Sequence, residues 1–137
     1  MKFSGNLSGI SLNTSQSGST AGIKRITSRS NGLKKVGILS QSRNLEHVSI
    51  ANVLSTGTTS TGEWYDCYKL TSICLPDLKD LKSYAGMNCM YFLEKIYAPK
   101  LEVLNNGTGA EFKGDVSLRE AVFPQLTAIN SISGYNF

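Results

Sequence analysis

His47 is the only histidine in the sequence, so it is the one imidazole that could act in acid–base catalysis. A single histidine excludes metal sites built on several imidazoles. Cys74 could approach His47 across neighbouring strands of a sheet and form a nucleophile–base pair. However, Cys74 occupies an ordinary position of a sequence repeat, and nothing nearby would orient the imidazole. We therefore expect no catalysis from this pair.

Other signals of chemistry are weak. The three cysteines are too few for the disulfide framework of a secreted domain, and their odd number favours free thiols that pack as small apolar residues. Gly107-Thr108-Gly109 lacks the following helix and the lysine of a phosphate-binding loop. No nucleophile elbow or zinc spacing is present. We expect a protein that is not an enzyme and that needs no metal and no cofactor.

Repeated blocks organise the chain from about residue 45 onward. The only prolines, Pro76, Pro99 and Pro124, recur at a nearly constant spacing. Each lies in a block whose apolar residues occupy the same columns; the blocks are residues 70–78, 93–101 and 118–126, with a fourth copy at 45–53 that has Ala51 in the proline column. A second pair of columns precedes the blocks, formed by Trp64 and Cys67, Gly86 and Cys89, and Phe112 and Asp115.

Each block begins approximately L-x-x-I-x-L, in which the last two apolar positions alternate as one face of a short strand requires. Proline directly after the strand lacks a backbone donor, so the ladder stops and the chain turns. One such unit cannot bury its apolar face alone, whereas stacked units share a continuous core. Unrelated strands of a β-sandwich are the alternative, but they do not explain prolines confined to one column.

These blocks resemble the BspA-like class of leucine-rich repeats, whose pattern is roughly A-F-x-x-C-x-x-L-x-x-I-x-L-P-x-x-L-x-x-I. Residues 64–81 and 85–104 match it best, and the resemblance covers about residues 44–130. It implies an α/β-type repeat fold, a leucine-rich-repeat solenoid of about four repeats with a short parallel sheet and irregular or short helical returns. The family buries its cysteine column, which implies packing roles for Cys67 and Cys89. Gly86 and Asp115 depart from the pattern, and so does the extra residue between Cys89 and Leu93.

The fold predicts which residues are buried and which face outward. The expected buried residues are Ile73, Leu75, Leu78, Leu81, Ile96, Leu101, Leu104, Phe123 and Leu126. By alternation, the outward columns read Ser49, Cys74, Tyr97 and Val122 on one side and His47, Ser72, Lys95 and Glu120 on the other. This mixed surface has one aromatic anchor, and we expect ligand contacts at His47, Lys95, Tyr97 and Glu120. A solvated sheet with no partner is the alternative.

Residues 1–45 hold seven basic and no acidic residues, against a net charge of +4 for the whole chain. We divide the chain into a Ser/Gly-rich basic N-terminal arm, residues 1–32, and a solenoid, residues 33–137, with residues 33–38 as a degenerate repeat start or edge strand. The expected docking residues are Lys24, Arg25, Arg29, Lys34 and Lys35. The charges favour an acidic protein surface over nucleic acid, since Phe3 is the only aromatic residue of the arm.

A non-enzymatic binding or adhesion module is the function that these features favour, with a protein partner preferred and a glycan left open. The alternative is a structural subunit of a larger assembly, such as a phage virion or fibre, docked through the basic arm. The aromatic terminus after Ile129 has no charged cap, which also favours an oligomer or assembly. No apolar run is long enough for a signal peptide or a membrane span, so we expect the chain in the cytoplasm or in a particle rather than secreted by the classical route.

Overall fold

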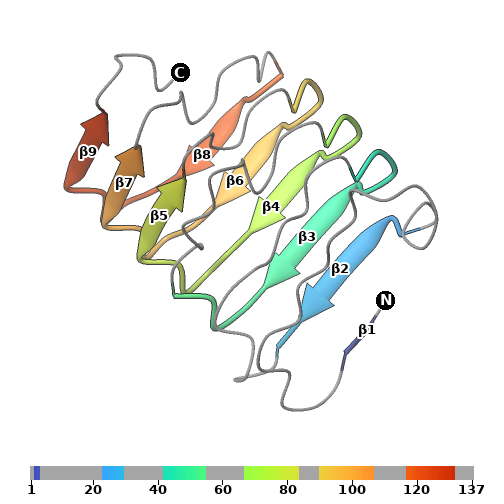
Figure 1. Ribbon diagram of the computed structural model, residues 1–137, viewed down its shortest axis with the longest axis horizontal. Helices are drawn as coiled ribbons and strands as arrows, with labels where there is room; N and C mark the ends of the chain where they lie inside the picture. Colours follow the sequence, from blue (N-terminus) through green and yellow to red (C-terminus); the bar gives the residue numbers. More distant parts are fainter. Residues whose placement is uncertain are drawn as a thin grey trace.

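The computed structural model describes residues 2–3, 23–29, 42–54, 67–83, 90–106 and 117–131 (Figure 1). These residues form nine strands and contain no helix. The strands are β1 (Lys2–Phe3), β2 (Arg25–Ser28), β3 (His47–Ile50), β4 (Ser72–Cys74), β5 (Asp80–Ser83), β6 (Lys95–Tyr97), β7 (Val103–Asn106), β8 (Glu120–Val122) and β9 (Ala128–Ser131).

The strands build two parallel sheets. The large sheet has six strands in the order β1-β2-β3-β4-β6-β8, and the small sheet has three in the order β5-β7-β9. Register partners in the large sheet from β2 onward recur at nearly equal intervals along the chain, in the series Arg25, His47, Ser72, Lys95 and Glu120. The small sheet keeps the same intervals, in the series Asp80, Val103 and Ala128. The chain therefore adds one strand to each sheet with every repeat from β4 onward, as Figure 1 shows.

The strands of the large sheet follow from alternation. Val48 and Ile50 of β3 are buried, and the residues beside them are half-buried. The same positions hold Ile73 and Leu75 in the next repeat and Ile96 in the one after. β-Branched residues favour the extended backbone, and only one face of each strand finds apolar neighbours.

Proline begins the turn that leads from the large sheet to the small one. The amide of Leu78 donates to the carbonyl of Leu75 over 3.2 Å, and Leu101 donates to Ala98 over 3.0 Å in the next repeat. Proline suits the second position of such a turn because its φ is already fixed. In the β3 repeat Ala51 and Asn52 take this place, and Asn52 has a φ of 65°, a value that asparagine tolerates better than most residues.

One apolar core runs along both sheets, and most of the expected core residues lie in it. Seven of the nine are buried, as predicted, whereas Phe123 and Leu126 are only partly buried against it. Both belong to the last described repeat, and no further described repeat covers their outer side. The predicted parallel pairing of the large sheet is also confirmed.

The small sheet is not predicted by the sequence, which gives each repeat one strand followed by an irregular or short helical return. Its strands form because the turn residues of one repeat pair with those of the next: the amide of Glu102 donates to the carbonyl of Lys79 over 2.9 Å, and Thr127 donates to Glu102 over 2.9 Å. The expected helical or irregular returns lie largely outside the described residues.

The large sheet begins earlier in the sequence than the expected boundary at residue 32. β2 lies within the segment assigned to the arm, yet Ile26 is part of the core and Arg25 pairs in register with His47. The spacing of Ile23, Ile26 and Ser28 follows the L-x-x-I-x-L columns with serine in the last one. Residues 33–38, expected to begin the repeats, lie outside the described residues.

The cysteine column also differs from the expected alignment. The amide of Leu70 donates to the carbonyl of Cys67, but the equivalent bond from Leu93 goes to Met90. Cys67 and Met90 are both fully buried, so Met90 takes the place that the sequence alignment gave to Cys89. The turn lies a fixed three residues before the leucine of each repeat. The extra residue between Cys89 and Leu93 therefore moves the buried position from Cys89 to Met90. Cys89 itself lies outside the described residues.

Candidate binding surface

The outer face of the large sheet carries two rows of side chains. The first row is Arg25, His47, Ser72, Lys95 and Glu120, and the second row is Thr27, Ser49, Cys74, Tyr97 and Val122. Parallel strands in register stack equivalent residues about 4.8 Å apart, which turns a sequence column into a row on the surface. The four predicted ligand contacts thus share one face, with His47, Lys95 and Glu120 in the first row and Tyr97 in the second.

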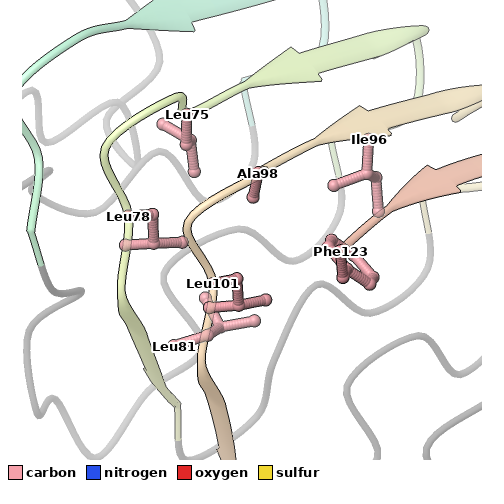
Figure 2. Close-up of a pocket in the computed structure, with 7 residues that line it drawn as sticks. All are labelled: Leu75, Leu78, Leu81, Ile96, Ala98, Leu101 and Phe123. Atoms are coloured by element: carbon pink, nitrogen blue, oxygen red, sulfur yellow. The ribbon is translucent and has the colours of Figure 1, made fainter. Parts of the chain in front are cut away.

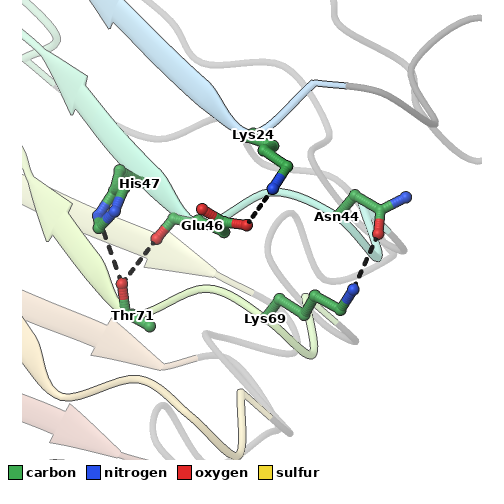
Figure 3. A network of polar contacts seen from close by, with 6 residues as sticks. All are labelled: Lys24, Asn44, Glu46, His47, Lys69 and Thr71. Carbon is green, nitrogen blue, oxygen red and sulfur yellow. Dashed lines mark hydrogen bonds and ion pairs between the residues drawn. The ribbon is translucent and has the colours of Figure 1, made fainter.

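His47 is held by hydroxyl groups. Its Nδ1 lies 2.8 Å from Oγ of Ser72 and 3.3 Å from Oγ1 of Thr71. The Thr71 hydroxyl donates to the carbonyl of Glu46 over 3.0 Å, so it accepts rather than donates at the imidazole (Figure 3). Cys74 is in register with Ser49, one row away, and the structure therefore pairs His47 with Ser72 instead of Cys74.

Lys95 and Glu120 form an ion pair of 3.1 Å across β6 and β8. Both side chains are more than half exposed, so the pair contributes only about 0.2–1 kcal/mol to stability. Tyr97 lies beside this pair in the second row and is 46% exposed. An exposed aromatic ring beside preformed polar contacts is the kind of anchor that protein interfaces use.

Some of the basic residues assigned to the arm lie on or beside the outer face of the large sheet. Lys24 pairs with Glu46 over 3.1 Å, directly before β2 and β3 (Figure 3). Arg25 continues the first row beside His47, and Arg29 is exposed directly after β2. Lys34 and Lys35 lie outside the described residues. Arg25, which was expected to dock the arm, thus lies in the same row as the predicted ligand contacts His47, Lys95 and Glu120.

An aromatic group at the turns before β4 and β6 was missed. The rings of Tyr68 and Tyr91 stack with centroids 6.0 Å apart and an interplanar angle of 9°. Phe92, next to them, is 60% exposed. On the same row of turns, Nζ of Lys69 donates to Oδ1 of Asn44 over 3.2 Å (Figure 3). The sequence could have predicted this stacking, because Tyr68 and Tyr91 each lie two residues before the first leucine of a repeat block.

A ladder of polar contacts crosses the turns between the two sheets. The amide of Asn52 donates to Oδ2 of Asp77 over 2.9 Å, and Nζ of Lys100 donates to Oδ1 over 2.7 Å. The hydrogen bond from Lys100, followed by that from Asn52, lowers the pKa of Asp77 below its usual value. The charged carboxylate thus links three successive repeats.

The described part of the core leaves a small apolar cavity where the two sheets meet, with a volume of about 10 Å³. Figure 2 shows the side chains that line it; they are Leu75, Leu78, Leu81, Ile96, Ala98, Leu101 and Phe123. This space is about the size of one water molecule, and no polar side chain lines it. It is a packing defect, too small for a ligand.

Two further kinds of feature, clusters of metal-ligand side chains and long apolar helices, can be sought among the described residues. These residues contain no cluster of three or more His, Cys, Asp or Glu side chains placed to hold a metal ion. In the same part of the chain, no helix has the length and hydropathy to cross a bilayer. The two rows on the outer face of the large sheet, with the exposed Tyr97 among them, form the candidate functional site.

Comparison with known proteins adds no relative: no family model matches the chain, and neither a curated protein nor a solved structure matches it. The resemblance to BspA-like repeats rests on the sequence columns alone, and it stays a prediction.

Proposed function

We propose that the chain is a non-enzymatic binding module with a leucine-rich-repeat solenoid fold. Support for the fold comes from the nearly constant separation, along the chain, of register partners on successive strands. The turn before each strand also recurs, with the amides of Leu45, Leu70 and Leu93 each donating to a carbonyl three residues earlier. Stacked units of this kind present a continuous sheet face to a partner.

The binding surface in this proposal is the outer face of the large sheet, with His47, Lys95, Tyr97 and Glu120 as contacts. The observation that carries it is the exposure of Tyr97 beside polar side chains that already interact, namely the Lys95–Glu120 ion pair and the hydrogen bond between His47 and Ser72. Polar side chains that are already paired lose little conformational entropy when a partner binds. The exposed ring of Tyr97 would then contribute a large part of the binding free energy through the apolar area that it buries.

The partner that fits this face is a protein surface. The first row offers cations at Arg25 and Lys95, an anion at Glu120, and hydrogen-bonding side chains at His47 and Ser72 between the two cations. A nucleic acid would need a run of cations that neutralises successive phosphates. The mixture here suits a surface with both charges and one apolar contact point, and a glycan is the other outcome of the test.

Substitution of Tyr97 tests the proposal. The whole chain, its Tyr97→Ala variant and its Phe92→Ala variant are immobilised, exposed to extract of the source cells and to a glycan array, and the captured molecules are compared. Phe92 is a matched control, because it is an even more exposed ring in the same repeat but lies outside the two rows. We expect a protein captured by the wild-type and Phe92→Ala chains and lost with Tyr97→Ala.

Titration of that purified protein then gives the magnitude. Loss of an anchor ring costs about 2 kcal/mol, which raises Kd roughly 30-fold in Tyr97→Ala. The melting temperature should change little, because the ring makes no part of the core. Equal affinity of the wild-type and Tyr97→Ala chains for every captured molecule would show that this face is not the binding surface.

A further inference from the structure

The last described repeat ends in an apolar surface that the inner repeats keep covered. Leu104 of β7 is 0% exposed, whereas its register partner in β9, Ile129, is 45% exposed. Ile96 of β6 is buried, whereas its partner in β8, Ala121, is exposed. We call this surface the β8/β9 end; it is formed by Leu118, Ala121, Phe123, Leu126 and Ile129.

Position at the edge of a sheet does not by itself explain the exposure. β5 is the opposite edge of the small sheet, and its Leu81 is only 2% exposed. In the large sheet, Ile26 of β2 is buried near the β1 edge. The two ends of the molecule therefore differ: the core is covered at the end that holds β1 and β2 and open at the β8/β9 end.

We propose that the β8/β9 end binds the same end of a second copy of this chain, in a two-fold symmetric dimer. Inside the molecule, the same columns in β6 and β7 are buried by the matching columns of the next repeat. The chemistry that covers this surface is thus another surface of the same kind. A two-fold axis brings two such ends together, and each then covers the other.

Charge favours this pairing over the others. Among the described residues, the polar rim of the β8/β9 end carries the cation Arg119 and the Lys95–Glu120 ion pair, so its net charge is small. The described residues of the opposite end carry Lys24, which pairs with Glu46, together with Arg25 and Arg29, so positive charge is in excess there. Among its described residues Ile26 is buried, whereas Leu54 beside β5 is exposed, so a head-to-tail contact is the other arrangement that the test distinguishes.

Edge strands add directional contacts to the apolar surface. Among the described strands, β8 and β9 are each the last of their sheet, and each presents an outer backbone edge. Such an edge pairs readily with another strand. A two-fold axis would align two β8 edges, or two β9 edges, in antiparallel orientation.

The test is the molar mass of the 137-residue chain in solution, measured by sedimentation equilibrium over a range of concentrations. Ile129→Glu and Ala121→Glu place a charge in the contact, and both sites are exposed in the single chain, so folding should survive. Leu54→Glu is the matched control: Leu54 is 50% exposed but lies beside β5, away from this end. Circular dichroism and thermal melting verify that each variant is folded.

We expect a dimer for the wild-type and Leu54→Glu chains, and a dissociation constant at least about tenfold higher for the other two, since a buried unpaired charge is strongly unfavourable. A monomeric wild-type chain at all concentrations would overturn the proposal. So would equal association of all four chains, loss of the dimer in Leu54→Glu, or a mass that grows beyond the dimer with concentration.

Discussion

At the scale of single residues, Asp77 shows how a polar side chain stabilises the stack of repeats. Its side chain is 23% exposed and accepts hydrogen bonds from the preceding and the following repeat. A carboxylate can accept both at once, whereas a neutral amide keeps the bond from Asn52 but loses the charge that attracts Lys100. The contribution of Asp77 therefore depends on its ionisation.

Asp77→Asn should lower the free energy of unfolding by about 0.5–1 kcal/mol at pH 7, because the partly exposed ion pair is screened by water. The folded pKa of Asp77 is lowered, so its stabilisation is complete above the unfolded pKa and disappears as pH falls through the folded pKa. Urea unfolding at pH 7 and near pH 3 measures this. The difference between the two chains should shrink in acid; a difference that is constant with pH would refute the role of charge.

At this scale, the sequence predicted which residues lie in a row on the sheet but not which side chains form hydrogen bonds with one another. The columns of His47, Lys95, Tyr97 and Glu120 follow from the repeat length, and the structure places them on one face. The bond from His47 to Ser72 depends on side-chain rotamers across two strands, which no spacing encodes.

At the scale of elements, the turn between the two sheets differs among repeats for a physical reason. The amide of Ala51 donates to the carbonyl of Ser28 over 2.9 Å, linking the turn after β3 to β2. Proline has no such donor. The columns alone would suggest that Ala51 is a position where proline is missing, but the structure gives it a hydrogen bond that proline would remove.

Ala51→Pro should accordingly destabilise the chain by about 1–3 kcal/mol, because the carbonyl of Ser28 loses this bond. Pro99→Ala is the matched change in the opposite direction, and it should cost less than about 1 kcal/mol through the unfolded chain. Thermal or urea unfolding of both variants measures the effects. A higher melting temperature in Ala51→Pro would contradict the role of this hydrogen bond.

The elements that the sequence predicted are those with alternating apolar residues and a proline after them. The small sheet was missed because the sequence offers a single column of large apolar residues in its strands, with Leu81 and Leu104 three residues after the turn leucines. β2 escaped because a single isoleucine, Ile26, enters the core among polar residues whose composition is typical of a linker.

At the scale of the whole molecule, the two proposals use two surfaces that adjoin at Glu120. The outer face of the large sheet would bind a partner, and the β8/β9 end would bind a second copy. A two-fold dimer through two β8 edges would continue the large sheet and leave its outer face open in both copies. Two identical faces would then give a divalent molecule, whose apparent affinity for a multivalent partner exceeds that of one face.

The central claim, that the outer face of the large sheet is the binding surface, can be tested with a thiol that the chain already carries. Cys74 is half-buried in the second row, in register with Ser49 and Tyr97. Cys67 is fully buried in the core and serves as the internal control for folding. Mass spectrometry of iodoacetamide-treated chain distinguishes the two sites by peptide.

The measurement is the rate of Cys74 alkylation with and without a saturating amount of the protein captured through Tyr97. We predict that the bound partner slows this reaction at least about tenfold, because a well-packed interface excludes water and solutes from its centre. Cys67 should stay unmodified in both samples. An unchanged rate at Cys74 in the saturated complex would contradict the account, since a partner on this face must cover that thiol.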